Sequence, residues 1–280
     1  MKLGTVNNRA VVVRDGLAFD IHQASSGVFG PAMSDILSAW ADFLKWAASA
    51  YFDSGEPIAD TMLGAPVPEP RQIFAVGLNY AEHATESGFT APPAPMLFTK
   101  FQSALCGPDQ AVELPDGNVD WEVELVVAIG VGGREITTDD ALDHVAGAMV
   151  GQDLSERTAQ MVGDPPQFSL AKSHPGFAPV GPLLVTLDEI PALDSLKIQC
   201  QLNGETVQSA STGDIIFSVP QLISYISHTA TLLPGDLIFT GTPPGVGMGR
   251  SPARYLSPGD ELVSSIDGLG EIRQHFYRAR

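Results

Sequence analysis

Two glutamates stand close together in an otherwise apolar stretch, VDWEVELVVAIG, at residues 119–130. The β-branched residues of this stretch predict a strand, whose side chains alternate between faces. Glu122 and Glu124 are therefore expected on one face, about 7 Å apart along the chain. If that face is solvated, the pair is an ordinary polar surface. If it is buried, each charge costs several kcal/mol unless something compensates it, and a divalent cation would do so.

A third oxygen ligand for such a cation is offered by Asp153, in the segment GQDLSERTAQ. It follows the apolar stretch AGAMVG, which would carry it inward, although a lone aspartate here is also typical of a turn or a cap. Mg²⁺ usually takes a few carboxylates and leaves its other positions to water or substrate oxygens. Arg157 and Gln160 follow at helical spacing, and they face either the same pocket or solvent.

His83 and Glu86, in NYAEHATESG, could move a proton. Residues three apart share a face of a helix, so the carboxylate could orient the imidazole and stabilise its protonated form, as a general base requires. An ordinary surface pair has the same spacing.

Lys172, in LAKSHPGFAPVGP, has apolar neighbours and leads into a Pro/Gly loop. Buried against negative charge, it could pair with a carboxylate or stabilise an oxyanion. The segment TGTPPGVG, residues 240–247, ends a predicted strand. Hydroxyl or backbone N–H groups of Thr240 and Thr242 could meet an anion there, and a plain tight turn is equally compatible.

The elements that must position these residues fall into two parts. Residues 1–66 are predicted as a small α/β region, with a hairpin in VVVRDGLAFDI turning at Asp-Gly and then a helix over residues 33–52. The Pro-rich joint PVPEPRQI separates this region from a main domain over residues 70–280.

The main domain is dominated by short β-runs between Gly and Pro, namely IFAVGL, ELVVAIGV, PLLVTL, KIQCQLNGETV, DLIFTGT and ELVSSI. Helices are predicted only over NYAEHATESG, TTDDALDHVAGAMV and SVPQLISYISHTATL. Strands and helices do not alternate as a doubly wound sheet requires, and no dinucleotide or P-loop fingerprint occurs. The predicted fold class is mainly β with peripheral helices (α+β), of roll or sandwich type.

Composition excludes several partner classes. The 33 acidic and 15 basic residues give the 280-residue chain a formal net charge of −18, which argues against nucleic acid and anionic lipid. Cys106 and Cys200 lack a CxxC spacing and are expected to be free, buried thiols. The N-terminus lacks the apolar core of a signal peptide, and no apolar run approaches the ~20 residues that span a bilayer, so a cytoplasmic location is expected.

Taken in order, these segments resemble the fumarylacetoacetate hydrolase family over residues 72–276. The resemblance is carried by VGLNYAEHATESG, PMLFTKFQSALCGP, VDWEVELVVAIG, GQDLSERTAQ, AKSHPGFAPVGP, LNGETVQSASTGDIIFSVPQLISYIS and LLPGDLIFTGTPPGVG. The subgroup it resembles most contains the smaller acylpyruvase and fumarylpyruvate hydrolase-like enzymes. The resemblance implies a β-sandwich roll that holds a metal site, and a homodimer.

The resemblance also implies a role for each candidate residue. Glu122, Glu124 and Asp153 match the family's ligands for Mg²⁺ or Mn²⁺. His83 and Glu86 match the family's catalytic pair, and Lys172 matches its pocket lysine. The substrate-side positions are matched by Arg157, Gln160 and Thr242. Two departures concern substrate identity more than the metal: FTK is followed by FQ where the family often has Pro and Ser, and QDLSERT replaces NDVSARD.

The activity that the resemblance implies is metal-dependent hydrolysis of a C–C bond in a 2,4-dioxo acid, an acylpyruvate such as fumarylpyruvate or maleylpyruvate. The products would be pyruvate and a carboxylic acid, in aromatic catabolism. The alternative is a decarboxylase or isomerase of 2-oxo acids, of the oxaloacetate decarboxylase or 2-hydroxyhepta-2,4-diene-1,7-dioate isomerase type, because it needs the same enolate. A third hypothesis is a protein that only binds a small 2-oxo acid.

Overall fold

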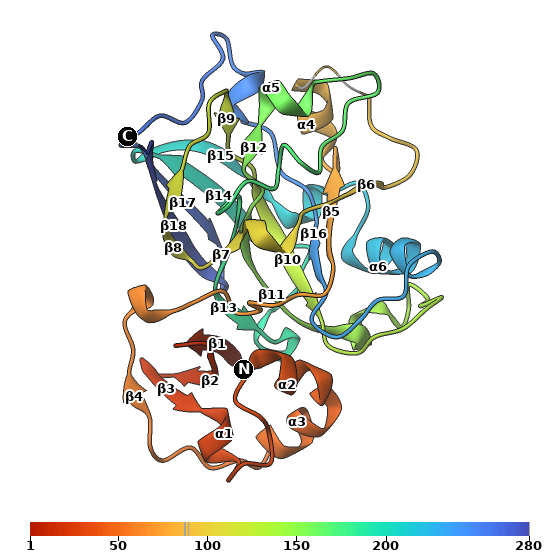
Figure 1. Cartoon of the computed structure of the whole chain (residues 1–280). Helices are drawn as coiled ribbons and strands as arrows, with labels where there is room; N and C mark the ends of the chain where they lie inside the picture. The colour runs from red at the N-terminus through yellow and green to blue at the C-terminus, as the bar shows by residue number, and fades with distance from the viewer. Residues whose placement is uncertain (87, 89, 280) are drawn as a thin grey trace.

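The computed structural model describes residues 1–86, 88 and 90–279 of the chain, and it is mostly β with helices at the periphery (Figure 1). The larger sheet has, in spatial order, β4 (Glu56–Pro57), β3 (Leu17–Asp20), β2 (Arg9–Arg14), β1 (Lys2–Val6), β13 (Ala178–Val185), β11 (Val145–Gln152), β10 (Val123–Ile129), β16 (Leu237–Phe239), β5 (Ile73–Gly77) and β6 (Met96–Thr99), with β7 (Leu105–Cys106) beside β13.

A second sheet contains β15 (Glu205–Ser211), β14 (Lys197–Leu202), β17 (Glu261–Ile266), β18 (Gly270–Tyr277) and β8 (Asp109–Glu113), and a two-stranded sheet pairs β9 (Val119–Asp120) with β12 (Ser155–Glu156). The central strands of the larger sheet pack on the second sheet: β10 contacts β14 and β17, and β13 contacts β18. Every residue of β10 and β11 is buried, as expected for strands at the centre of a sandwich core. The predicted mainly β fold class is confirmed.

The helices lie around these sheets, and they are α1 (Ile21–Ala24), α2 (Met33–Ser38), α3 (Trp40–Ala47), α4 (Ala81–Glu86), α5 (Arg157–Gln160) and α6 (Val219–Ser227). Short 3₁₀ turns connect other elements, namely η1 (Asp60–Met62), η2 (Gln102–Ala104), η3 (Ala141–His144), η4 (Leu187–Glu189), η5 (Thr212–Asp214) and η6 (Gly247–Gly249). In the described part of the chain, no helix has the length and apolarity needed to cross a bilayer.

The N-terminal region has the predicted hairpin. Asp15 and Gly16 join β2 to β3 with positive φ angles of 50° and 75°, which a two-residue turn of this kind requires. The predicted single helix over residues 33–52 is instead two helices, α2 and α3, which break at Ala39. Strand β1 pairs with β13, so this region continues the larger sheet. The division into residues 1–66 and 70–280 stays a prediction.

The predicted helix over TTDDALDHVAGAMV is wrong. Only the turn η3 forms there, and Val145–Gln152 is the central strand β11. This strand pairs with β10 on one side and with β13 on the other, and burial there outweighs the helical preference of its alanines and Met149. Gly147 permits the close approach of β13, because a Cβ at Gly147 would lie 2.3 Å from the Val185 carbonyl oxygen. Of the two free cysteines, Cys200 is buried as expected and Cys106 is half-buried.

Candidate active site

Antiparallel pairing of β10 with β11 brings the three predicted carboxylates together. Val123 lies opposite Gln152, so the start of β10 meets the end of β11, and the Asp153 N–H donates to the Glu122 carbonyl at 2.9 Å. One carboxylate oxygen each of Glu122, Glu124 and Asp153 lies within 4.8 Å of the others. All three side chains are buried, with exposures of 5 %, 2 % and 0 %. The solvated surface considered for the two glutamates is therefore excluded.

Two buried glutamines hold the backbone of this carboxylate cluster (Glu122, Glu124 and Asp153). Glu122 precedes the first residue of β10, so the regular ladder does not fix it. The Gln152 side-chain oxygen accepts from the Glu122 N–H at 2.8 Å, and the Gln208 oxygen accepts from the Val123 N–H at 3.0 Å. The sequence analysis did not identify either glutamine, because nothing local distinguishes them from ordinary strand residues.

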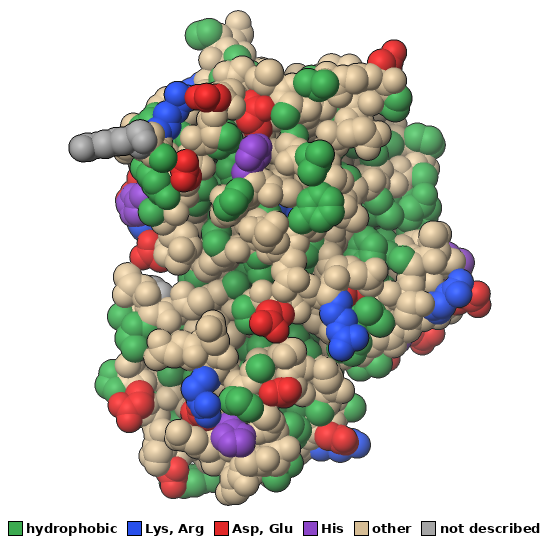
Figure 2. Space-filling model, viewed as in Figure 1, with side chains coloured by type: hydrophobic (Ala, Val, Ile, Leu, Met, Phe, Trp, Pro, Cys, Tyr) green, Lys and Arg blue, Asp and Glu red, His purple; other side chains and the backbone are tan. Residues whose placement is uncertain are grey.

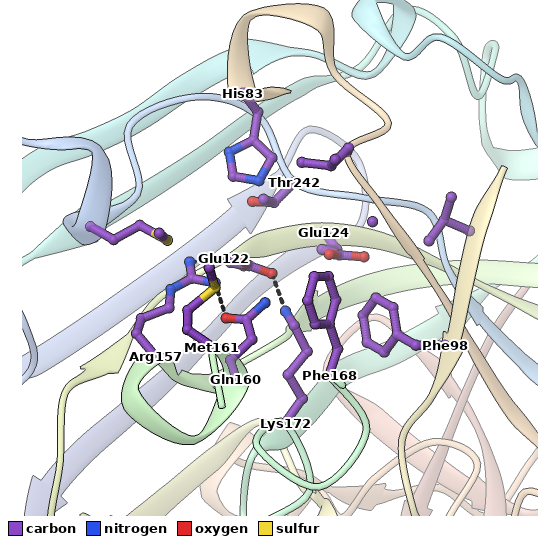
Figure 3. A pocket seen from close by; sticks show the side chains of 14 residues that line it. His83, Phe98, Glu122, Glu124, Arg157, Gln160, Met161, Phe168, Lys172 and Thr242 are labelled. Carbon is purple, nitrogen blue, oxygen red and sulfur yellow. Dashed lines mark hydrogen bonds and ion pairs between the residues drawn. The ribbon is translucent and has the colours of Figure 1, made fainter. Parts of the chain in front are cut away.

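Two buried lysines, Lys100 and Lys172, lie against the cluster, and Figure 3 shows Lys172. Lys172 Nζ donates to Glu122 at 2.6 Å, to Asp153 at 2.7 Å and to the Ser155 hydroxyl at 2.8 Å. Lys100 Nζ donates to the other Asp153 oxygen at 2.5 Å and to the Lys172 carbonyl oxygen. Lys172 lies where the prediction placed it, whereas Lys100 was noted only for the residues that follow it. Each lysine compensates charge that burial would otherwise make costly.

The charges in the cluster are unevenly compensated. Burial alone raises the pKa of Glu122, but the positive charges of Lys172 and Arg157 outweigh burial and hold that pKa well below its usual range. The pKa of Glu124 is raised, first by burial and then by the negative charges of Asp153 and Glu122. Glu124 accepts a hydrogen bond from the Gly241 N–H at 2.8 Å.

This donor set fits a hard divalent cation. Three carboxylates converge, and one of them lacks a strong positive partner, so a cation would relieve their mutual repulsion. Oxygen ligands are those that Mg²⁺ and Mn²⁺ prefer. The number, charge and burial of the three carboxylates are what make the cluster suitable for such a cation.

Arg157, the first residue of α5, extends the charged network. Its Nε donates to Asp120 at 2.8 Å, and its Nη1 donates to the Gln160 side-chain oxygen at 2.8 Å. Its Nη2 forms an ion pair with Glu122 at 2.7 Å, but makes no hydrogen bond of good geometry with any described residue. Arg157 and Gln160 line the same pocket as Glu122 and Glu124. Of the two orientations considered, their side chains therefore face the pocket and not solvent. The sequence analysis missed Asp120, although it lies only two residues before Glu122.

The predicted proton-transfer pair sits on α4, and its His83 lies across the pocket from Lys172 (Figure 3). His83 Nδ1 lies 2.9 Å from Glu86 Oε1, and the Glu86 carboxylate accepts from the Gly245 N–H at 2.9 and 3.0 Å. His83 is 6 % exposed and lines the pocket. Because Glu86 occupies Nδ1, the other ring nitrogen, Nε2, is the one left for a ligand.

Thr242 also lines the pocket, but its hydroxyl is engaged with the protein. It donates to the Val123 carbonyl at 2.9 Å and accepts from the Gln208 side-chain amide at 2.9 Å. The Thr240 hydroxyl likewise donates to the Leu125 carbonyl at 2.9 Å. These hydroxyls fix the loop to β10, and substrate binding by Thr242 stays a prediction.

Apolar side chains narrow the pocket above the charged residues. Phe98 and Phe168 meet edge to face with ring centres 5.7 Å apart, and Lys172 Nζ lies 5.1 Å from the centre of the Phe98 ring. Met161 and Met248 complete this wall. Figure 2, viewed as in Figure 1, shows apolar side chains spread between polar ones over the upper part of the molecule. A small anionic ligand with a short apolar part suits this lining.

A family model described as "Fumarylacetoacetate (FAA) hydrolase C-terminal" matches residues 72–277. The oxaloacetate tautomerase FAHD2A, mitochondrial, of Bos taurus is 44% identical over 218 residues, which cover 77% of this chain and 69% of that protein. The human protein of the same name has the same identity and coverage.

Solved structures are similar over the full length. A protein from Mycobacterium smegmatis, provisionally assigned as HpcE, is 52% identical with a TM-score of 0.97, and the match covers 100% of both chains. Maleylpyruvate hydrolase from Sphingobium sp. SYK-6, in complex with manganese (II) ion and pyruvate, is 28% identical with a TM-score of 0.81 over 100% of both chains.

Proposed function

Because the chain belongs to the fumarylacetoacetate hydrolase family, we propose that it is a divalent-metal-dependent enzyme that interconverts the keto and enol forms of a small 2-oxo dicarboxylic acid such as oxaloacetate. The observation that carries the proposal is the His83–Glu86 pair, whose imidazole shares one pocket with the carboxylate cluster. A base held beside a cation site suits the removal of a proton from the carbon next to a carbonyl.

The cofactor in this proposal is Mg²⁺ or Mn²⁺, held by Glu122, Glu124 and Asp153. When bound, the cation supplies the positive charge that draws in the carboxylate and 2-oxo oxygens of the acid and makes the neighbouring C–H bond more acidic.

Charge balance in the pocket supports an anionic substrate. In the ion-pair network around the cluster, four buried carboxylates, Asp120, Glu122, Glu124 and Asp153, lie among three buried basic residues, Lys100, Arg157 and Lys172. With all seven ionised, four negative and three positive charges leave an excess of one negative charge. A divalent cation would turn this into an excess of one positive charge, which attracts a dianionic acid into a pocket of low dielectric.

The chain's own residues would then move one proton. His83 Nε2 would accept the proton from C3 of the acid and return it at the 2-oxygen, so no atom is gained or lost. Glu86 accepts at Nδ1 and would stabilise the imidazolium form between the two steps. Lys172 would stabilise negative charge on the substrate oxygen, and Arg157 with Gln160 would hold a carboxylate of the acid.

Hydrolysis of an acylpyruvate is the second candidate. The same His83–Glu86 pair could deprotonate a water that attacks the C4 carbonyl of a 2,4-dioxo acid, releasing pyruvate and a carboxylic acid. The similarity to maleylpyruvate hydrolase favours this candidate. Decarboxylation of oxaloacetate would need the cation but no attacking water, so it would depend little on His83.

One panel of assays separates these reactions. With Mn²⁺ and with Mg²⁺, we would follow the ultraviolet absorbance of enol-oxaloacetate, pyruvate release from oxaloacetate, and pyruvate release from fumarylpyruvate and maleylpyruvate. We expect rapid loss of the enol form without pyruvate release. Faster pyruvate release from either acylpyruvate would replace the tautomerase proposal by hydrolysis, and pyruvate release from oxaloacetate would replace it by decarboxylation.

The oligomeric state and location stay proposals. A homodimer would show a solution mass twice the 29.6 kDa of the chain, as measured by light scattering. A cytoplasmic location stays a prediction, since the mammalian relatives are named as mitochondrial. The acidic composition argues against nucleic acid and anionic membranes as partners, and a small 2-oxo acid stays the proposed one.

A further inference from the structure

The loop Gly245–Gly249 contacts both sides of the pocket through its backbone. At one end the Gly245 N–H donates to both oxygens of Glu86, the residue that orients His83. Further along, the Gly247 N–H donates to Asp120 Oδ1 at 2.7 Å and the Met248 N–H donates to Asp120 Oδ2 at 3.0 Å. One short segment therefore holds both Glu86, which contacts His83, and Asp120, which contacts Arg157.

Asp120 is completely buried, and four donors use its carboxylate. Besides the two loop N–H groups, Oδ1 accepts from the Trp121 N–H at 2.8 Å and Oδ2 accepts from Arg157 Nε at 2.8 Å. A charged carboxylate with this many partners fixes the positions of the groups it binds.

The contact with Arg157 determines which part of the guanidinium reaches the pocket. Asp120 occupies Nε and Gln160 occupies Nη1. The remaining nitrogen, Nη2, is buried without a hydrogen bond of good geometry to the described residues. Nη2 lies 2.7 Å from Glu122, so Asp120, Gln160 and Glu122 together set how the guanidinium faces the pocket. Without Asp120, the guanidinium could rotate and offer other nitrogens.

The loop is packed too tightly for a side chain at Gly247, and Gly249 lies in close contact with Glu86. A Cβ at Gly247 would lie 1.9 Å from the Arg254 carbonyl oxygen and 2.7 Å from Asp120 Oδ1. A Cβ at Gly249 would lie 3.1 Å from Glu86 Oε2. Glycine at these positions lets the backbone reach both carboxylates.

We propose that Asp120 is a positioning residue that ties the loop Gly245–Gly249 to Arg157, so that the anion-binding guanidinium and the His83–Glu86 pair are held in one arrangement. The proposal rests on the proposed function only in assigning Arg157 to the substrate carboxylate. The contacts among Asp120, the loop and Glu86 stand independently of the reaction catalysed.

The test uses Asp120→Asn in the full chain, with Asp116→Asn as the matched control, because the Asp116 side chain is fully exposed. Oxalate, a rigid mimic of an enolised 2-oxo acid, is titrated calorimetrically into the Mn²⁺-loaded protein. Asp120→Asn should weaken oxalate binding by about tenfold or more, because the guanidinium is no longer aligned. Mn²⁺ binding should change by less than about threefold, because Asp120 lies outside the carboxylate cluster.

Hydrogen exchange tests the link between the two sides. In Asp120→Asn, amide exchange should accelerate about tenfold both in residues 243–250 and in residues 79–86. The described residues of α4 make no hydrogen bond to Asp120 and are linked to it only through the loop. Unchanged exchange in residues 79–86, or unchanged oxalate affinity, would overturn the proposal. Neither result depends on turnover, so a failed tautomerase assay leaves this test intact.

If Asp120→Asn does not fold, Gly249→Ala provides the second variant, since its Cβ would press on Glu86 at 3.1–3.2 Å rather than on backbone. It should accelerate exchange in residues 79–86 and also weaken oxalate binding about threefold or more, through the loop. An effect on residues 79–86 alone, with oxalate affinity unchanged, would show that the two sides are independent and would refute the link.

Discussion

The two sides of the pocket are built in different ways. The carboxylate cluster is set by the pairing of two fully buried central strands, and buried lysines lie against it. The His83–Glu86 pair sits on a six-residue helix, α4, and Glu86 is held by the N–H of one loop residue. Strand pairing fixes positions rigidly, whereas a short helix held by few contacts opens more easily. This difference suits the proposed roles, in which the cluster holds a cation and the pair moves a proton.

The largest effect is expected from the removal of one carboxylate of the cluster. Glu122→Gln should weaken Mn²⁺ binding by more than ~100-fold and abolish activity, because the cation loses a charged ligand. Calorimetry and elemental analysis would measure the metal. Glu113→Gln, on the exposed face of β8, is the control. A Glu122→Gln protein that keeps a full complement of metal would contradict the assignment of the cluster.

On the other side, His83→Ala should lower turnover by ~10²–10⁴, the usual contribution of a positioned base, without loss of metal. Steady-state rates and metal content would be measured on the same sample. Glu86→Gln should give a smaller loss, because it keeps a hydrogen-bond acceptor for His83 but removes the charge that stabilises imidazolium. A rate unaffected by His83→Ala removes this residue from the mechanism.

Stability should depend on the cluster more than on exposed charge pairs. Lys172→Met leaves Glu122 and Asp153 short of a buried partner, so we expect a loss of about 3 kcal/mol in the free energy of unfolding. Urea unfolding in EDTA would measure it. The exposed pair of Lys45 with Asp42 provides the control, and Lys45→Met should leave stability essentially unchanged. Equal effects of the two variants would show that the buried charges need no compensation.

The smallest expected effect concerns pH. The pKa of Glu124 is raised in the folded protein by burial and by Asp153 and Glu122. Between the unfolded value of about 4.3 and this raised value, the folded state binds more protons, so stability of the metal-free protein falls as pH rises. The lowered pKa of Glu122 affects stability only at pH values below that range.

Urea midpoints in EDTA should therefore decrease from mildly acidic to neutral pH. Mn²⁺ in excess should reverse this trend, because it binds the ionised carboxylates and stabilises the folded state. Glu124→Gln should remove the decrease. A midpoint in EDTA that rises with pH over the same range would show that Glu124 is ionised in the metal-free protein.

Much of the fold could be predicted from the sequence where the signal was local. The hairpin with Asp15-Gly16, the strands around IFAVGL, ELVVAIGV and ELVSSI, and helix α6 with its Ser218–Gln221 capping box all form. The candidate site could also be predicted from the sequence, because a carboxylate pair in an apolar strand is chemically unusual. The strand β11 was missed, because its alanines and glycines have no strand preference of their own and form a strand only between β10 and β13.

The sequence by itself determined which residue types were present to bind a cation and move a proton, and in which local segments they lay. Only the tertiary structure decided that Asp153 lies beside Glu122, that Lys100 and Gln208 support the cluster, and that Asp120 links Arg157 to a distant loop. The physical reason is that these contacts join residues 31 to 127 positions apart through strand pairing and buried hydrogen bonds. Local propensity carries no information about partners at such separations.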